Sequence, residues 1–233
     1  MADIAGIALK QILGSLEQHG YRHIEHVPDS FDYISALSAI GPLMTQYQGD
    51  LIREVQPNPA VPDDANSAAS TSAATPHTEF YEFPDIPPRY VALWCIRPAL
   101  PDGGATTLAD GYRFLAEFTT DERSRLFDEI RDWRSRPTLA AEGIAPTSCR
   151  TPALVRHHGR LVMRFSTRDL HRDGELTSAY IDRGQEFFNA HHIAVRLEQR
   201  SLLIWDNWRM IHARTAFDDR RRHLRRILIG EAA

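Results

Sequence analysis

The chain has 233 residues, with 27 basic and 31 acidic side chains and a formal net charge of −4. This balance gives no overall attraction to polyanions, so we expect no nucleic-acid partner. No signal peptide and no apolar run long enough to cross a bilayer is recognisable, which predicts a cytoplasmic protein without a membrane partner. The length suits a single domain over residues 1–233 that is mostly β with flanking helices, and it leaves the oligomeric state open.

The first part of the chain predicts two helices, one strand and a loop. Apolar residues recur at helical spacing from Ile7 to Leu16, and a second helix is expected over 30–40, where a Gly-Pro pair ends it. Residues 51–55 predict a short strand. Residues 60–76 are small and polar, with NSAASTSAATP at 66–76, and predict a flexible active-site loop.

The rest of the chain alternates predicted strands and helices. The pair Thr119 and Glu122 forms a capping-box pattern, which predicts a helix from there to about Trp133. His158-Gly159 predicts the turn of a hairpin. The other expected elements are a strand over 90–96, a long loop over 137–151, hairpin strands over 152–157 and 160–165, a helix over 177–190, and strands over 201–205 and 227–229.

The triplet His77-Thr78-Glu79 follows the predicted loop directly. In an extended chain, residues two apart point to the same side, so His77 and Glu79 would present an imidazole and a carboxylate to one cation. The triplet is common by chance and is weak evidence alone. Its position, where a loop enters sheet structure, favours a functional role.

A second group of candidate residues lies near the C-terminus. His212 follows a buried-strand pattern and is followed by an arginine-rich segment, RRHLRR at 221–226. Alternation places Arg222, Leu224 and Arg226 on one face, and guanidinium groups bind carboxylates through two parallel hydrogen bonds. Two histidines and one carboxylate are the ligand set of non-haem Fe(II) oxygenases, which leaves coordination positions open for a co-substrate and O2.

These motifs together resemble the Fe(II)/2-oxoglutarate-dependent oxygenases of the TauD/TfdA, clavaminate-synthase-like family. The resemblance covers most of the chain, from about Gln48 to the last strand. The segments that carry it are HTE at 77–79, GGATTLADG at 103–111, WDNWRMIHARTAF at 205–217 and RRHLRR at 221–226.

The resemblance implies a double-stranded β-helix, or jelly roll, and it implies roles for seven residues. His77, Glu79 and His212 would ligate Fe(II) and form the catalytic centre. Arg222 and Thr106 would bind the distal carboxylate of the co-substrate 2-oxoglutarate. Arg226 would bind the primary substrate, with Gln48 as a second substrate-binding residue.

The resemblance also implies a hydroxylase that uses O2 on an unactivated C–H bond of a small polar substrate. Many members have Asp where Glu79 stands, and Glu resembles the branch that hydroxylates free amino acids. An amino acid or a derivative is therefore the expected substrate, although the chain is short for the family. A zinc-dependent hydrolase, or a non-catalytic jelly-roll binding protein, are the alternatives that the residues leave open.

Overall fold

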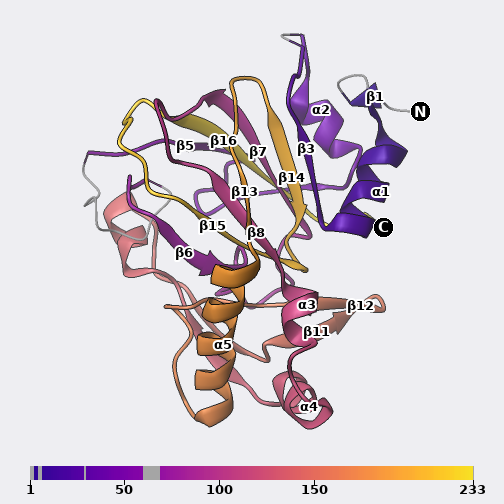
Figure 1. Cartoon of the computed structure of the whole chain (residues 1–233), viewed down its shortest axis with the longest axis vertical. Coiled ribbons are helices and arrows are strands. Elements are labelled where there is room, and N and C mark those ends of the chain that lie inside the picture. The colour runs from indigo at the N-terminus through magenta and orange to yellow at the C-terminus, as the bar shows by residue number, and fades with distance from the viewer. Residues whose placement is uncertain (1–2, 5–6, 29, 60–68, 233) are drawn as a thin grey trace.

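The computed structural model describes residues 3–4, 7–28, 30–59 and 69–232, and these form two antiparallel sheets with helices around them (Figure 1). The larger sheet has the order β3 (Tyr21–Ile24), β14 (Leu202–Asp206), β7 (Tyr90–Arg97), β16 (His223–Ile229) and β4 (Leu43–Met44), with β5 (Ile52–Val55) also on β16. The smaller sheet has the order β13 (Ile193–Val195), β8 (Thr106–Asp110), β15 (Met210–Arg214) and β6 (Ala74–His77).

The central strand β7 shows how the sequence builds the layers. Its run YVALWCIR is apolar on both faces, as expected for a strand that is covered on both sides. Val91, Leu93 and Cys95 join a core cluster that also contains Leu108 of β8. That cluster lies between the two sheets. The alternate residue Ala92 packs in a different cluster, on the outer face of the larger sheet.

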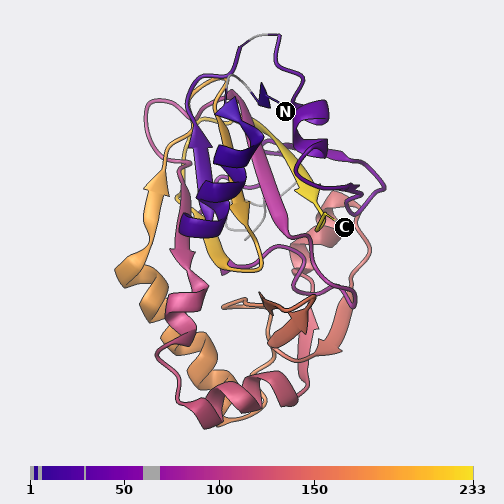
Figure 2. The ribbon, with the colours of Figure 1, turned by 90° about the vertical axis from the view of Figure 1, so that its right-hand side faces the viewer.

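Helices α1 (Leu9–His19) and α2 (Tyr33–Ser38) cover that outer face, as the view in Figure 2 shows. Ile12, Leu16 and Leu37 are buried there. Short helices are marginally stable alone. Burying each such side chain stabilises the folded state by about 1.5–3 kcal/mol, which is enough to hold these helices on the sheet. Both predicted N-terminal helices are therefore confirmed.

The lower part of the molecule in Figure 1 packs against the other face of the smaller sheet, where Ile211 and Ala213 join its core. It contains α3 (Gly111–Leu115), α4 (Thr120–Asp128), α5 (Glu175–His191), and the strand pairs β9 (Arg131–Arg134) with β10 (Ser148–Thr151) and β11 (Leu154–His157) with β12 (Arg160–Met163). The 3-10 helix η1 (Pro137–Glu142) lies beside β6 at the left of Figure 1. At the N-terminus, β1 (Asp3–Ile4) pairs with β2 (Ile7–Ala8).

Three expectations from the sequence need correction. The capping-box helix is present but ends at Asp128, because residues 131–134 (RDWR) alternate between buried and more exposed side chains and pair as a strand. The predicted loop over 137–151 contains η1 and β10. Within the predicted loop at 60–76, residues 60–68 lie outside the described part, and residues 74–76 belong to β6. No helix in the described part is long and apolar enough to span a membrane.

Candidate metal centre and its pocket

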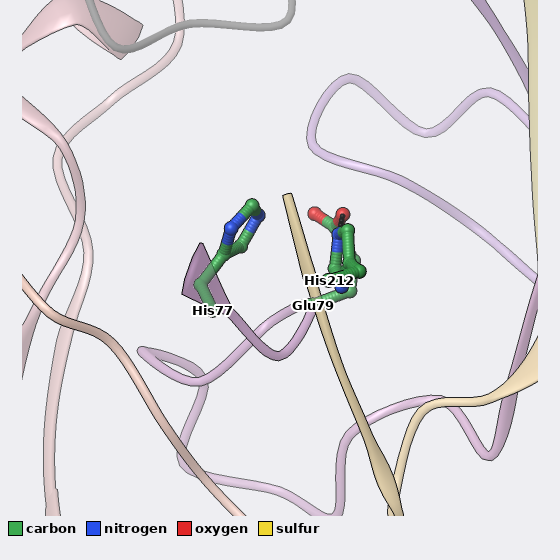
Figure 3. Close-up of side chains that lie close together, drawn as sticks. All are labelled: His77, Glu79 and His212. Carbon is green, nitrogen blue, oxygen red and sulfur yellow. Dashed lines mark ion pairs between the residues drawn. The ribbon is translucent and has the colours of Figure 1, made fainter. Parts of the chain in front are cut away.

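Strands β6 and β15 bring the two candidate histidines together. His77 is the last residue of β6 and lies directly opposite His212 of β15 in the antiparallel register. Residues opposite each other in a sheet are close enough for their side chains to touch, and the two ring centroids are 4.2 Å apart. Figure 3 shows both rings and the Glu79 carboxylate projecting to the same side of the ribbon.

Glu79 lies two residues beyond the end of β6, and its backbone is held by one buried side chain. Its N–H donates to Asn207 Oδ1 at 2.6 Å, and its carbonyl accepts from Asn207 Nδ2 at 3.0 Å. Thr78 points the other way, since its hydroxyl accepts a hydrogen bond from the backbone of Phe165. The alternation expected for His77-Thr78-Glu79 is therefore present although the strand itself ends at His77.

The three side chains offer ligand atoms that all lie within 4.8 Å of one another. His77 donates from Nδ1 to the carbonyl of Thr75 at 2.8 Å, which leaves the lone pair of Nε2 facing the pocket. His212 Nε2 is 3.6 Å from Glu79 Oε2. A bound His usually has its second nitrogen fixed in this way by a carbonyl or carboxylate, so His77 has the tautomer that a metal requires.

Electrostatics keep this group in the state that binds cations. Burial and the Arg136 guanidinium hold the pKa of His77 well below its usual range, and burial also lowers the pKa of His212. Burial alone would raise the pKa of Glu79, but Arg226 and the imidazoles outweigh it and hold that pKa well below its usual range. At neutral pH the group therefore offers two neutral imidazoles and one carboxylate, which fits a divalent transition metal.

One pocket connects six of the seven candidate residues, namely His77, Glu79, His212, Thr106, Arg222 and Arg226. Arg222 is 3% exposed, and its guanidinium lies 5.0 Å from the ring centroid of Phe217. One amino group donates to the carbonyl of Gly104 at 3.3 Å, while Nη1 is buried with no partner among the described residues. A buried guanidinium nitrogen without an acceptor is costly, which indicates an anionic ligand at this position.

Arg226 connects the candidate metal ligands to the larger sheet. Its Nη1 lies 2.8 Å from Glu79 Oε1, and its Nε donates to Gln46 Oε1 at 2.9 Å. The structure does not bring Gln48 to this pocket: its side chain is exposed, and its Nε2 lies 3.4 Å from the carbonyl of Glu142. The reason is a tight turn, closed by a hydrogen bond from Gly49 N–H to the Gln46 carbonyl, which projects Gln48 outward and keeps Gln46 buried.

Sequence reasoning missed two further arginines that line the pocket, Arg136 and Arg214. Arg136 Nη2 lies 2.5 Å from His77 Nε2. Arg214 donates to the carbonyl oxygen of Ser70 at 2.9 Å, and burial lowers its pKa to about 9. Arg214 stands two residues after His212 on the same strand, so alternation was a signal for it. Arg136 reaches the pocket only through the tertiary fold, so no local pattern indicated it.

A second group with metal-ligand chemistry lies away from this pocket, on the β11–β12 hairpin. His157, His158 and Glu231 have ligand atoms within 4.8 Å of one another. The turn residue His158 has φ of 46°, a left-handed conformation that stacks its ring on that of His157 at 4.0 Å. Adjacent residues of an extended strand point to opposite sides, but this turn puts the two histidines side by side.

Comparison with known proteins places this chain among oxygenases. The family model described as taurine catabolism dioxygenase TauD, TfdA family matches residues 5–228, and the chain belongs to this family. No curated protein sequence matches it. The family resemblance of the sequence motifs is therefore confirmed over nearly the whole chain.

Solved structures with this fold include an asparagine oxygenase and a non-heme iron oxygenase. An asparagine oxygenase in complex with Fe(II), 2S,3S-3-hydroxyasparagine and succinate has a TM-score of 0.79 and 18% identity, over 96% of this chain and 79% of that chain. The non-heme iron oxygenase OrfP in complex with Fe and alpha-ketoglutaric acid has a TM-score of 0.72 and 17% identity, over 97% of this chain and 82% of that chain. OrfP with Fe, succinate and (3S)-hydroxy-L-Arg gives 0.73 at 17% identity and the same coverage. At these identities the similarity shows a shared fold.

Proposed function

We propose that the protein is an Fe(II)- and 2-oxoglutarate-dependent oxygenase that hydroxylates an unactivated C–H bond of an amino acid or a close derivative. The observation that carries this proposal is the meeting of His77, Glu79 and His212 in one pocket whose wall also holds the buried guanidinium of Arg222. Membership of the TauD/TfdA family supports it. So do structural relatives whose complexes contain iron, alpha-ketoglutaric acid or succinate, and hydroxylated asparagine or arginine.

The three ligands would hold iron on one face and leave its other positions to small molecules. Bound there, iron supplies the chemistry in which 2-oxoglutarate, O2 and a C–H bond give succinate, CO2 and a hydroxylated product. The task of the chain is orientation and exclusion of water. His77 and His212 are 6% and 8% exposed, and Glu79 is 4% exposed, so the centre is nearly dry. The hydrogen bonds between the Asn207 side chain and the Glu79 backbone keep the Glu79 carboxylate directed into the pocket.

Arg222 and Thr106 would bind the distal carboxylate of 2-oxoglutarate. Arg222 offers a buried donor nitrogen, and burial lowers its pKa only to about 10, so it stays cationic at neutral pH. Thr106 is 3% exposed, begins β8 and lines the same pocket. A cation with a neutral hydroxyl beside it is a suitable partner for one carboxylate group.

Arg226 and Glu79 would bind the substrate as a zwitterion. Arg226 Nη2 is buried with no partner in the described part of the chain, so it is available to donate a hydrogen bond to a substrate carboxylate. Glu79 supplies a nearby negative charge for the α-amine. Gln46, which holds the Arg226 guanidinium, replaces Gln48 as the positioning glutamine in this proposal.

The jelly-roll assignment is also a proposal, supported by the order of the strands. The chain passes from β6 in the smaller sheet to β7 in the larger one and back to β8, and later from β14 to β15 to β16 in the same alternating way. This repeated crossing between facing sheets is typical of double Greek-key folds.

The test is consumption of 2-oxoglutarate by purified protein loaded with Fe(II) under air, without added substrate. An oxygenase is expected to release succinate slowly in this uncoupled reaction and to stop when iron is chelated. A zinc hydrolase or a non-catalytic binding protein would release none. Absence of succinate in the presence of bound iron would overturn the proposed function.

A further inference from the structure

Arg136 lies at the centre of the proposed active site without a role in the functions assigned so far. It stands between β9 and η1, and its Nη2 is 2.5 Å from His77 Nε2. Its side chain lines the main pocket and also a smaller adjoining pocket. Glu79 and Arg226 line both pockets as well, so the smaller one begins where the α-amino and α-carboxylate groups of an amino acid would be bound.

A divalent ion on His77 Nε2 would repel the guanidinium at its present distance, because both are cations. Arg136 would then extend into the adjoining pocket, which its side chain already lines. In that direction it would meet the substrate's side chain, because Glu79 and Arg226 line the adjoining pocket as well. A guanidinium held there by the protein is a ready partner for a carboxylate.

The charges around the two pockets favour an anionic side chain over a cationic one. Among the described residues that line them, five are arginines and two are glutamates, namely Arg53, Arg136, Arg214, Arg222, Arg226, Glu79 and Glu142. Each glutamate is already in an ion pair, Glu79 with Arg226 and Glu142 with Arg53. With Glu79 assigned to the α-amine, a basic side chain would have to compete for the Glu142–Arg53 pair, and leaving a buried charge unpaired is costly.

We propose, on the basis of the oxygenase function above, that Arg136 binds an anionic side-chain group of the substrate, and that the substrate is a small acidic amino acid. Aspartate and glutamate are the amino acids whose short side chains end in a carboxylate. Arg226 and Glu79 bind the α-carboxylate and the α-amine, which all amino acids share. Arg136 binds the side chain and so selects among amino acids.

The experiment compares amino acids that differ mainly in charge. Protein with Fe(II) and 2-oxoglutarate is given L-aspartate against L-asparagine, L-glutamate against L-glutamine, and L-lysine and L-arginine. Coupled succinate release with a product mass gain of one oxygen reports turnover. Calorimetric titration without O2 reports binding alone. We expect one acid to exceed its amide in kcat/KM and in affinity by about 10-fold or more, because an ionised partner strengthens a hydrogen bond.

Variants at two neighbouring arginines locate the effect. Arg136→Gln should reduce kcat/KM for the preferred acid by about 30-fold or more, mainly through KM, as expected when a buried charge pair loses one member. It should change kcat/KM for the amide little and leave the affinity for 2-oxoglutarate unchanged, because that co-substrate is assigned to Arg222 and Thr106. Arg136→Lys should recover part of the loss. Arg134→Gln is the matched control, since Arg134 is exposed and pairs with Asp132 outside the pocket.

The outcomes separate this inference from the function on which it rests. No 2-oxoglutarate consumption would overturn the oxygenase function and the inference together. Uncoupled consumption without turnover of either acid, or turnover of neutral or basic amino acids in preference, would overturn the inference alone. A raised 2-oxoglutarate requirement in Arg136→Gln, with substrate binding unchanged, would also overturn it and assign Arg136 to the co-substrate.

Discussion

Arg226 Nη1 lies 2.8 Å from Glu79 Oε1, so the arginine proposed to bind substrate is in direct contact with a proposed metal ligand. Both side chains are nearly buried, with 9% and 5% exposed. A pair in this environment is screened little by salt. With the roles proposed above, occupation of the metal site and binding of the substrate would be coupled through one carboxylate, whose other oxygen faces His212.

The first prediction concerns the metal ligands. His77→Ala and His212→Ala should each abolish tight Fe(II) binding while the protein stays folded, because both side chains line the pocket and neither belongs to a hydrophobic core cluster. Anaerobic Fe(II) titration and circular dichroism measure the two effects. His171→Ala, at an exposed position, is the control. Full Fe(II) affinity in either variant would remove that histidine from the ligand set.

The second prediction concerns the co-substrate. Arg222→Ala should weaken 2-oxoglutarate binding by about 2–5 kcal/mol, because a buried carboxylate would lose its charged partner. Thr106→Ala should cost about 1 kcal/mol, the value of one neutral hydrogen bond. The apparent 2-oxoglutarate requirement for succinate release measures both. If Arg226→Ala abolished 2-oxoglutarate binding and Arg222→Ala did not, the two arginines would have exchanged roles.

The sequence predicted those parts of the site that depend on local alternation. His77 and Glu79 share a side, and Leu224 and Arg226 face the pocket with Arg222, because an extended chain fixes such directions. The outer strands and helices were predictable for a similar reason, since their apolar spacing is visible in the chain.

The remaining parts depend on tertiary contacts. Gln48 and Gln46 are equivalent by alternation, and only the turn at 46–49 decides which one is buried. The segment after Asp128 continues an apparently helical pattern, but Arg131 and Trp133 are buried by packing against the lower core and form a strand instead. Arg136 follows that strand. Because the helix was predicted to continue to about Trp133, the sequence did not predict that Arg136 lines the pocket.

The third prediction concerns Gly104, which has φ of 66° beside Arg222. A Cβ there would lie 3.0 Å from Arg222 Nε and 3.1 Å from its Cδ. Gly104→Ala should therefore displace the guanidinium and weaken 2-oxoglutarate binding without removing any charge. Gly159→Ala is the control, because Gly159 has φ of 78° and no atom within 4 Å of such a Cβ. Gly159→Ala introduces a similar backbone strain of about 1–2 kcal/mol but should leave 2-oxoglutarate binding intact. If both variants weakened 2-oxoglutarate binding equally, backbone strain and not contact with Arg222 would explain the effect of Gly104→Ala.

The fourth prediction concerns Asn207, which is fully buried and bonds the backbone of Glu79 and the carbonyl of Pro88. Asn207→Ala should lower the unfolding free energy by about 2–3 kcal/mol or more, since buried backbone groups would lose their partners. It should also weaken Fe(II) binding, because Glu79 would no longer be held in place. Urea unfolding and Fe(II) titration measure the two effects, with the exposed Asn189→Ala as control. Loss of stability with unchanged Fe(II) affinity would contradict the positioning role.

The last prediction concerns Asp206, the last residue of β14 and the residue directly before Asn207. Burial raises the pKa of Asp206 from 3.8 to about 6, although Arg89 and the Trp208 N–H oppose this effect. The folded protein therefore holds this proton more tightly than the unfolded chain does. The resulting stabilisation is complete below about pH 4 and is lost as the pH rises through 6.

Asp206→Asn removes this dependence and keeps an oxygen for the Trp208 N–H, which Asp206 Oδ1 accepts at 3.0 Å. The difference in unfolding free energy between wild type and Asp206→Asn should shift by up to about 3 kcal/mol in favour of the variant between pH 4 and pH 7. Urea unfolding across this range measures it, and the exposed Asp218→Asn variant controls for the loss of one negative charge. A constant difference across the range would show that Asp206 titrates alike in the folded and unfolded chain. Asp206 would then contribute no pH dependence to the stability of the protein.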